Sequence, residues 1–218
     1  MRRRQTSEGR RGAAKRAPVI GVTGGYGSGK SYVSGVFRRA GCAVIDADEV
    51  AHEAIRPGTV AWRRIVAHFG SQVLGAGRVI DRKKLAALVF GSRHELKYLN
   101  GLVHPAVLKE VRVRIARCRR EREKVVVLNA PLLIESGAHE LCEKVIVLSV
   151  TKEVQIRRCE RSKHESVAAI RKRIAAQMPL SRKLRYADYV VDNNGTRSQT
   201  VKQVQGILRN IREEYNIS

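Results

Sequence analysis

A segment near the amino terminus combines the residue types that bind phosphate groups with the spacing that phosphate binding needs. Residues 24–31 read GGYGSGKS, which fits the pattern G-x-x-x-x-G-K-[ST] at every fixed position. Glycines let backbone N–H groups approach a phosphate closely, and a helix that begins directly after them adds a partial positive charge. We therefore predict that this segment binds a nucleoside triphosphate.

The flanking sequence supports this prediction. The apolar run 19–22 predicts a strand and the pattern from residue 32 onward predicts a helix, which argues against the alternative of a glycine-rich turn that binds nothing. Lys30 is expected to reach the β- and γ-phosphates of ATP, and the Ser31 hydroxyl to ligate Mg²⁺. The residues of this segment that we expect to contact ATP are Gly25, Tyr26, Gly27, Ser28, Gly29, Lys30, Ser31 and Tyr32.

Two carboxylates follow the second predicted strand, 43–45. Asp46 and Asp48 are two residues apart, so in an extended segment they share a face and can point into one cleft at the carboxyl edge of a sheet. Phosphoryl transfer needs a group that accepts the proton of the acceptor hydroxyl, and it needs Mg²⁺ held in place. The alternative is that Asp48 caps a helix over 49–55. Beside a phosphate-binding segment we favour the catalytic interpretation.

The elements that must position these residues alternate between short β-branched runs and longer helical patterns. This alternation is typical of an α/β fold with a parallel sheet. Nearly eighty residues of helical pattern separate the second and third strands, which predicts a helical insertion at the carboxyl edge of the sheet. Residues 152–187 predict a helix–turn–helix, and a final helix covers about 196–215. The predicted strands cover 19–22, 43–45, 125–128, 145–150 and 189–191.

The 218-residue chain is strongly basic, with 43 Lys and Arg against 20 Asp and Glu, a formal net charge of +23. Basic residues are concentrated in the first 17 residues and again in 152–185. Such patches attract polyanions, which include nucleic acids but equally a nucleoside triphosphate or a phosphorylated cofactor. Aromatic residues make up 5% of the chain, too few to indicate stacking platforms for single strands. Charge alone does not identify the partner.

The cysteines and the apolar runs of the sequence bear on the cellular compartment of the protein. The four cysteines form no CxxC pair and no zinc-ligand spacing with histidine, and the amino terminus lacks the apolar region of a secretory signal. We therefore expect free thiols and a cytoplasmic location. No run approaches the roughly 18 apolar residues of a membrane span, so we expect no membrane partner. Residues 1–17 are expected to be a disordered basic tail, with an organelle transit peptide as the alternative.

Taken together, the motifs resemble those of one family, the dephospho-coenzyme A kinases, within the nucleoside-monophosphate-kinase-like P-loop proteins. The resemblance runs from about residue 19 to the final helix. It rests on GVTGGYGSGKS at 21–31, DAD at 46–48 with His52, FG at 69–70, IDR at 80–82 with Leu85 and Phe90, HP at 104–105, PLLIE at 131–135 and ADYVVDN at 187–193.

The resemblance implies a phosphotransferase with an alcohol acceptor. It implies that ATP, with Mg²⁺, phosphorylates the 3′-hydroxyl of the ribose of dephospho-coenzyme A. The implied fold is a P-loop NTPase fold with a five-stranded parallel sheet, in a kinase domain over 18–218. Within it, the core covers 18–48, 125–151 and 188–218, the helical acceptor-binding insertion 49–124, and the lid 152–187. Separately from the resemblance, we expect no specific nucleic-acid partner and a monomer or weak homo-oligomer.

Site residues follow from the same resemblance. Asp48 resembles the base that accepts the proton of the ribose hydroxyl, and Asp46 a helper near the metal. Arg157 and Arg161 resemble lid arginines that cover the phosphates, with Arg158 in place of Arg157 if the register differs by one. Asn193 resembles a residue on the adenine side of the ATP site, and capping of its loop explains it equally well. Acceptor-binding positions are Thr23, Asp48, His52, Arg82, His104, Leu133 and Glu135.

Some features leave alternatives open. His104 could instead start a helix, with Pro105 at the first helical position. Many family members carry Asp where this chain has Asn129, which makes metal binding from that strand doubtful.

A shikimate-kinase-like enzyme is one alternative function, although its family is typically shorter and the segments 104–105 and 131–135 argue against it. A nucleic-acid-binding ATPase is the other, suggested by the net charge and the basic tail.

Overall fold

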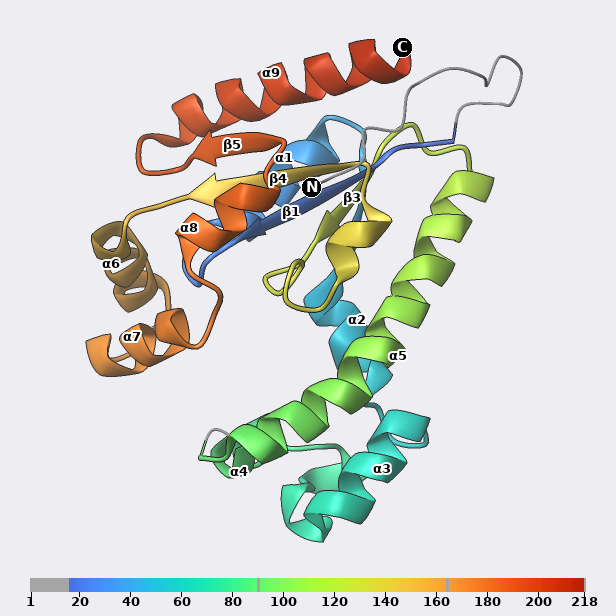
Figure 1. Cartoon of the computed structure of the whole chain (residues 1–218), viewed down its shortest axis with the longest axis vertical. Coiled ribbons are helices and arrows are strands. Elements are labelled where there is room, and N and C mark those ends of the chain that lie inside the picture. Colours follow the sequence, from blue (N-terminus) through green and yellow to red (C-terminus); the bar gives the residue numbers. More distant parts are fainter. Residues whose placement is uncertain (1–15, 90, 164, 218) are drawn as a thin grey trace.

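The structure is a computed structural model, and it describes residues 16–89, 91–163 and 165–217 (Figure 1). The predicted basic tail over 1–17 lies outside these residues except for Arg16 and Ala17, and so does Phe90. Among the described residues, no helix combines the length and the apolar character that crossing a bilayer requires.

A five-stranded parallel sheet forms the centre of the molecule, in the order β2-β3-β1-β4-β5. All residues of the central strand β1 are buried, because helices cover both faces of the sheet. The predicted α/β class and the five-stranded parallel sheet are therefore confirmed. The strands are β1 (Val19–Gly24), β2 (Ala43–Asp46), β3 (Val126–Asn129), β4 (Lys144–Ser149) and β5 (Tyr189–Asp192).

The register of the sheet brings three strand ends to one place. Asn129 at the end of β3 is paired with Val22 of β1 and with Asp46 at the end of β2. Because β1 leads directly into residues 24–31, the phosphate-binding segment begins beside Asp46 and Asn129. Parallel α/β sheets bind ligands at this carboxyl edge.

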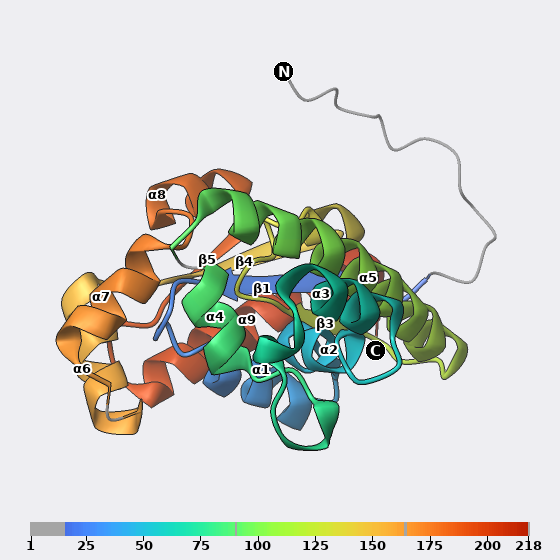
Figure 2. The same cartoon turned by 90° about the horizontal axis from the view of Figure 1, so that it is seen from below.

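One face of the sheet is covered by α1 (Lys30–Arg39) and α9 (Arg197–Tyr215). Phe37 of α1 and Ile211 of α9 are fully buried in the cluster that these helices form with the strands. Seen from below, α1 and α9 lie on one side of β1 and α5 lies on the other (Figure 2). The packing fixes α1, so its amino terminus stays at the carboxyl edge of β1.

The opposite face is covered by the second half of α5 (Arg93–Arg120), whose Val111 belongs to a second buried cluster. His104 and Pro105 lie inside this 28-residue helix, so the alternative that His104 starts a helix is wrong. Proline has no N–H to donate to the carbonyl of Gly101, four residues earlier, and α5 continues through this point. His104 thus lies within the long helix α5, which runs from the insertion to the sheet.

The chain between β2 and β3 forms a helical insertion with a core of its own. Ile65, Phe69 and Leu85 belong to a buried cluster that is separate from the two sheet clusters. Figure 1 shows α3 and α4 at the end of the molecule that is opposite to α9. The elements before α5 are α2 (Ala47–Ala54), α3 (Val60–Phe69), α4 (Arg82–Val89) and 3₁₀ turns at Ser71–Val73 and Ala76–Arg78.

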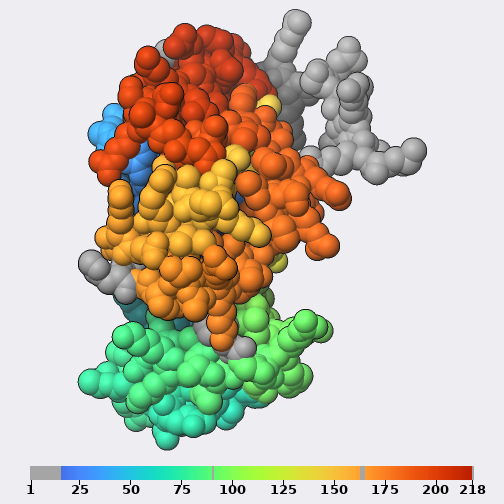
Figure 3. Space-filling view, turned by 90° about the vertical axis from the view of Figure 1, so that its left-hand side faces the viewer, coloured from blue at the N-terminus to red at the C-terminus, as the bar shows by residue number. Residues whose placement is uncertain are grey.

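Three helices connect β4 to β5, and we call the segment 152–187 that contains them the lid. They are α6 (Lys152–Lys163), α7 (Val167–Ala175) and α8 (Leu180–Lys183). In a side view, α6 and α7 lie above the helices of the insertion (Figure 3). Short 3₁₀ turns at Ala138–Leu141 and Leu184–Tyr186 complete the described elements.

Candidate active site

The loop between β1 and α1 has the conformation of a phosphate cradle. Gly27 and Gly29 have φ angles of 73° and 87°, in the left-handed region that favours glycine. Gly29 is the N-cap of α1 and offers no side-chain cap, so the first amide groups of the helix can face a bound anion. The predicted phosphate-binding segment thus has the backbone geometry that its glycines suggested.

This cradle is also too crowded for any side chain at its glycines. A Cβ atom on Gly27 would lie 2.6 Å from Cys159 Sγ and 3.0 Å from the carbonyl oxygen of Gln155, both on α6. A Cβ atom on Gly29 would lie 2.4 Å from Asn193 Nδ2, in the loop after β5. Helix α6 of the lid and the loop after β5 therefore both pack against the cradle.

Asn193 supports the cradle through its side-chain amide. The side chain is buried, its Nδ2 donates to the carbonyl oxygen of Ser28 at 2.7 Å, and its Oδ1 accepts from Thr200 Oγ1 at 2.6 Å. These two hydrogen bonds fix the amide against the loop and agree with the capping interpretation. Contact of Asn193 with ATP stays a prediction.

Lys30 lies on the cradle itself. Its Nζ donates to the carbonyl oxygens of Gly24 and Gly25, each at 3.1 Å. The next residue, Ser31, is exposed on the first turn of α1. Both side chains therefore lie at the loop that is predicted to bind the phosphates.

Asp46 starts the helix that follows β2. Its Oδ1 accepts from the backbone N–H of Asp48 at 2.9 Å, which makes Asp46 the N-cap of α2. Its Oδ2 accepts from Asn129 Nδ2 at 2.8 Å. The alternative that Asp48 caps the helix is wrong, because α2 begins at Ala47, two residues earlier than the sequence indicated.

Asp48 is the carboxylate that remains open to solvent at this edge. The protein around it partly desolvates the carboxylate, and this raises the pKa of Asp48 together with the nearby charge of Asp46. The charges of Lys30 and Arg82 act in the opposite direction on the pKa of Asp48, and so does the nearby imidazole of His52. Predicted residues from the cradle and from the insertion therefore lie close enough to Asp48 to influence its charge.

The same edge contains groups that suit a magnesium ion. The Asp46 carboxylate keeps lone pairs beyond its two hydrogen bonds, and the Ser31 hydroxyl is exposed. Asn129 is buried, and among the described residues its Oδ1 has no hydrogen-bond partner. Asn129 donates to Asp46, which a carboxylate at this position could not do, so it orients Asp46. These residues fit Mg²⁺ with retained water ligands.

The lid places its arginines differently from the sequence prediction. Arg157 and Arg161 are exposed, and each follows a cradle-facing residue of α6 by two positions, which is about 200° around a helix. Arg158 is half-buried, and its Nη1 lies 3.8 Å from the point that a Cβ atom on Gly29 would occupy. The alternative register is therefore the one that the structure favours, with Arg158 at the cradle.

A second lid arginine, which the sequence analysis missed, contacts the cradle through Tyr26. The guanidinium of Arg173 on α7 lies 5.2 Å from the centre of the Tyr26 ring and donates to its hydroxyl at 3.3 Å. The same hydroxyl donates to Glu165 at 2.8 Å. The sequence signal for this contact was weak, because Tyr26 occupies one of the variable positions of the motif.

Two of the predicted acceptor-binding residues are not accessible. Leu133 is fully buried, and its Cδ2 fills the space beside Gly21 of β1. Thr23 is also fully buried, and its hydroxyl donates to the carbonyl oxygen of Pro131 at 3.3 Å. In this structure both side chains are packed inside the protein, and their contact with the acceptor stays a prediction.

Glu135, from the same run, is held by a buried lysine. Lys183 of α8 has no exposed surface, and its Nζ donates to both oxygens of Glu135 at 2.8 and 3.0 Å. It also donates to the carbonyl oxygen of Pro131 at 2.9 Å, so all three of its protons have partners. The backbone N–H of Met178 donates to Glu135 at 3.1 Å. Lys183 thus connects the end of the lid to the loop after β3.

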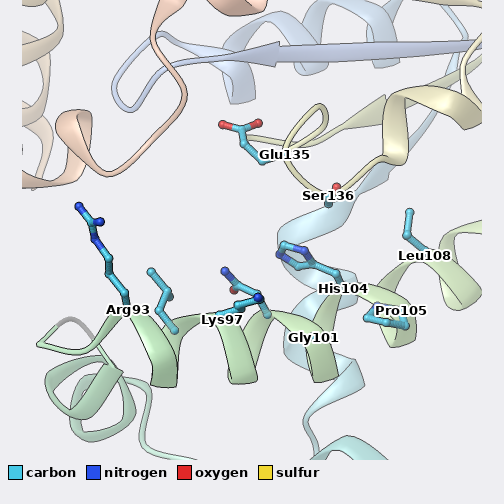
Figure 4. Close-up of a pocket in the computed structure, with 10 residues that line it drawn as sticks. Arg93, Lys97, Gly101, His104, Pro105, Leu108, Glu135 and Ser136 are labelled. Carbon is cyan, nitrogen blue, oxygen red and sulfur yellow. The ribbon is translucent and has the colours of Figure 1, made fainter.

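Glu135 and His104 line one pocket of about 610 Å³ between α5 and the loop after β3 (Figure 4). Burial lowers the pKa of His104, and the nearby Glu135 carboxylate opposes this shift. These two predicted acceptor residues are therefore brought together. The pocket is lined by Arg93, Leu96, Lys97, Asn100, Gly101, His104, Pro105, Leu108, Glu135 and Ser136.

Comparisons with solved structures identify the class of the fold. A shikimate kinase from Acinetobacter baumannii superposes with a TM-score of 0.51 at 18% identity, over 92% of this chain and 96% of that chain. At this identity the likeness concerns the fold alone. Together with the glycine cradle at the end of β1, it shows that the chain has the P-loop kinase fold.

The family follows from closer relatives. The model of the dephospho-CoA kinase family, CoaE, matches residues 18–199. A dephospho-CoA kinase from Geobacillus kaustophilus is 45% identical over 191 residues, 88% of this chain and 95% of that protein. The chain therefore belongs to the dephospho-CoA kinase family, which confirms the family predicted from its motifs.

Structural comparison agrees with this assignment. A dephospho-CoA kinase from Campylobacter jejuni superposes with a TM-score of 0.67 at 26% identity, over 90% of this chain and 98% of that chain. A protein from Thermus thermophilus superposes with a TM-score of 0.78 at 29% identity, over 90% of this chain and 99% of that chain. The chain is thus an ATP-using phosphotransferase of this family.

The buried Lys183 generates a prediction about stability. Lys183→Met should lower the free energy of unfolding by roughly 3–5 kcal/mol, because it leaves the Glu135 carboxylate without its buried partner. Urea denaturation followed by circular dichroism measures this change. Lys183→Met combined with Glu135→Gln should recover part of the loss.

Lys144 provides the matched control, because it pairs with Glu214 at the surface. Lys144→Met should cost about 0–1 kcal/mol. Equal losses for the two lysine variants would contradict a special contribution of the buried pair.

Proposed function

We propose that this chain transfers the γ-phosphoryl group of ATP to the 3′-hydroxyl of the ribose of dephospho-coenzyme A. The observation that carries the proposal is the position of Asp48. Its solvent-accessible carboxylate interacts with Lys30 of the cradle and with Arg82 and His52 of the insertion. A donor phosphate on the cradle and an acceptor hydroxyl held by the insertion would therefore meet at this carboxylate.

Asp48 accepts the proton of the ribose hydroxyl in this proposal. Its raised pKa supports the role, since a more basic carboxylate takes up the proton more readily at neutral pH while still being ionised. In a loose phosphoryl-transfer transition state the proton leaves late, so holding the hydroxyl in line is a large part of the task. Arg82 and His52, which contact each other, are positioned to hold the ribose beside Asp48.

Charge on the transferring group is offset by several cations. Lys30 provides one from the cradle, and Arg158 provides one from the lid, where a planar guanidinium suits charge that is spread over equatorial oxygens. Arg173, which pairs with Glu165, holds Tyr26 of the cradle. Ser31 and Asp46 would hold Mg²⁺, and Asn129 would keep Asp46 oriented. When bound, Mg²⁺ neutralises charge on the β- and γ-phosphates.

The proposal also assigns a separate task to each of two segments of the chain. The insertion, 49–124, binds the acceptor, and the lid, 152–187, closes over the nucleotide. Its α6 already packs on Gly27, and its α8 reaches the acceptor pocket through Lys183 and Glu135. Closure of the lid would therefore act on both substrates at once.

An acceptor competition tests the proposal. ADP release is measured with dephospho-coenzyme A, shikimate and single-stranded DNA supplied one at a time. The proposal predicts release with dephospho-coenzyme A and none above background with the other two. Release that depends on DNA or on shikimate would overturn it.

Removing the base gives a second test. Asp48→Asn should lower kcat by about 10²–10⁴-fold, the usual contribution of a positioned general base. ATP affinity, measured by calorimetry, should stay near the wild-type value, because the cradle is intact. A loss of only a few fold would mean that Asp48 positions the hydroxyl without accepting its proton.

The pKa of Asp48 predicts the pH dependence. Because its pKa is raised, the acid limb of kcat/KM should lie above the pH of about 3.9 at which an ordinary aspartate titrates. Asp46→Asn removes a neighbouring negative charge, so it should lower the pKa of Asp48 and move the acid limb to lower pH, while asparagine still provides an N-cap. A pH–rate profile from about pH 4 to about pH 8 measures the limb.

Glu49→Gln is the control for this profile. Glu49 is an exposed acid in the same helical turn and is not among the groups that shift the pKa of Asp48. Its substitution should leave the acid limb in place. An acid limb that moves upward in Asp46→Asn would contradict the assignment to Asp48.

A further inference from the structure

The charged group of the acceptor is a different part of the molecule from the hydroxyl that reacts. Dephospho-coenzyme A contains a diphosphate on the 5′ side of its ribose, and this group brings two negative charges into the protein. In the proposed function the groups near Asp48 hold the ribose, and the diphosphate extends away from them. A site that binds the whole acceptor therefore needs cations elsewhere on the insertion.

Two cations face the acceptor pocket from the first turns of α5. Arg93 and Lys97 are one turn apart, and with His104 they form a stripe along one side of the helix. Figure 4 shows the side chains of Arg93 and His104 on the same side of α5, the side that faces the loop carrying Glu135. The stripe from Arg93 to His104 is about 16 Å long at about 1.5 Å per residue, so it can follow an extended ligand.

The charges of these two residues are available to a ligand. In the described parts of the chain, neither Arg93 nor Lys97 forms an ion pair with a carboxylate, and both are exposed. They also lie at the amino-terminal end of a 28-residue helix, where the backbone favours an anion. Their pair is therefore suited to a dianion at the mouth of the pocket.

The one carboxylate that lines this pocket does not cancel the attraction. Glu135 is the only acidic residue among the lining residues that the structure describes. Its two oxygens already accept from Lys183, and one of them also from Met178. Because Lys183 offsets the charge of Glu135, Arg93 and Lys97 give the lining of the pocket a net positive charge.

We propose that Arg93 and Lys97 form the subsite that binds the diphosphate of the acceptor. This inference rests on the proposed function and adds to it the part of the substrate that this end of the pocket recognises. Each residue would donate charge-assisted hydrogen bonds, which are among the stronger polar contacts in proteins. Each residue should therefore contribute about tenfold or more to acceptor affinity.

The test compares kinetic constants of Arg93→Gln, Lys97→Gln and the double variant with those of the full-length wild type. The KM for dephospho-coenzyme A should rise about tenfold or more for each single variant, and further for the double variant. The KM for ATP should not change. Arg112→Gln is the matched control, because Arg112 is exposed on the same helix but does not line the pocket.

Adenosine shows whether the rise in KM comes from the diphosphate, because it has the ribose and its 3′-hydroxyl but no diphosphate. Its inhibition constant against dephospho-coenzyme A should be the same in wild type and in the two single variants. An unchanged KM for dephospho-coenzyme A in the double variant, or an equal rise in the inhibition constant of adenosine, would overturn the subsite. A wild-type protein that releases no ADP with dephospho-coenzyme A would instead refute the proposed function.

Discussion

The backbone of the cradle is held by two elements that are distant from it in the sequence. Cys159 and Gln155 of α6 pack on Gly27, and Asn193 after β5 packs on Gly29. Asn193 cannot easily move away, because hydrogen bonds fix both ends of its amide. The amide groups that would bind phosphates are thus preorganised by packing, and this arrangement needs glycine both for its φ angles and for its space. The positions of α1, of Lys30 and of the lid all depend on it.

Electrostatics connects this cradle to the insertion. Lys30 of the cradle and Arg82 and His52 of the insertion all influence the charge of Asp48, so in the proposed function the two substrates would meet at this carboxylate. The lid takes part through two different contacts, α6 on the cradle and Lys183 on Glu135 beside the acceptor pocket. A movement of the lid would change both contacts, so the proposed closure over the nucleotide would also alter the pocket that Glu135 lines.

The sequence predicted the parts of the site that a local motif determines and missed those that depend on packing. The cradle with Lys30 follows from glycine spacing, and Asp48 follows from its place after a strand. The lid register could not be decided, because Arg157 and Arg158 are adjacent and only the packing of α6 shows which one faces the cradle. The burial of Leu133 could not be predicted, because an apolar run after a strand can line a pocket or enter the core. Lys183 was overlooked because lysine is rarely buried, and its partner Glu135 is distant in sequence.

Crowding, and not the φ angle alone, makes the cradle depend on glycine. Gly29 and Gly58 have φ angles of 87° and 88°, but a Cβ on Gly58 would meet no atom within 4 Å. Calorimetric titration of ATP into Gly29→Ala and Gly58→Ala therefore separates crowding from backbone strain, which both variants share. We expect that Gly29→Ala stays folded but loses measurable ATP binding, while Gly58→Ala binds ATP like the wild type. Wild-type affinity in Gly29→Ala would contradict the dependence of the cradle on packing.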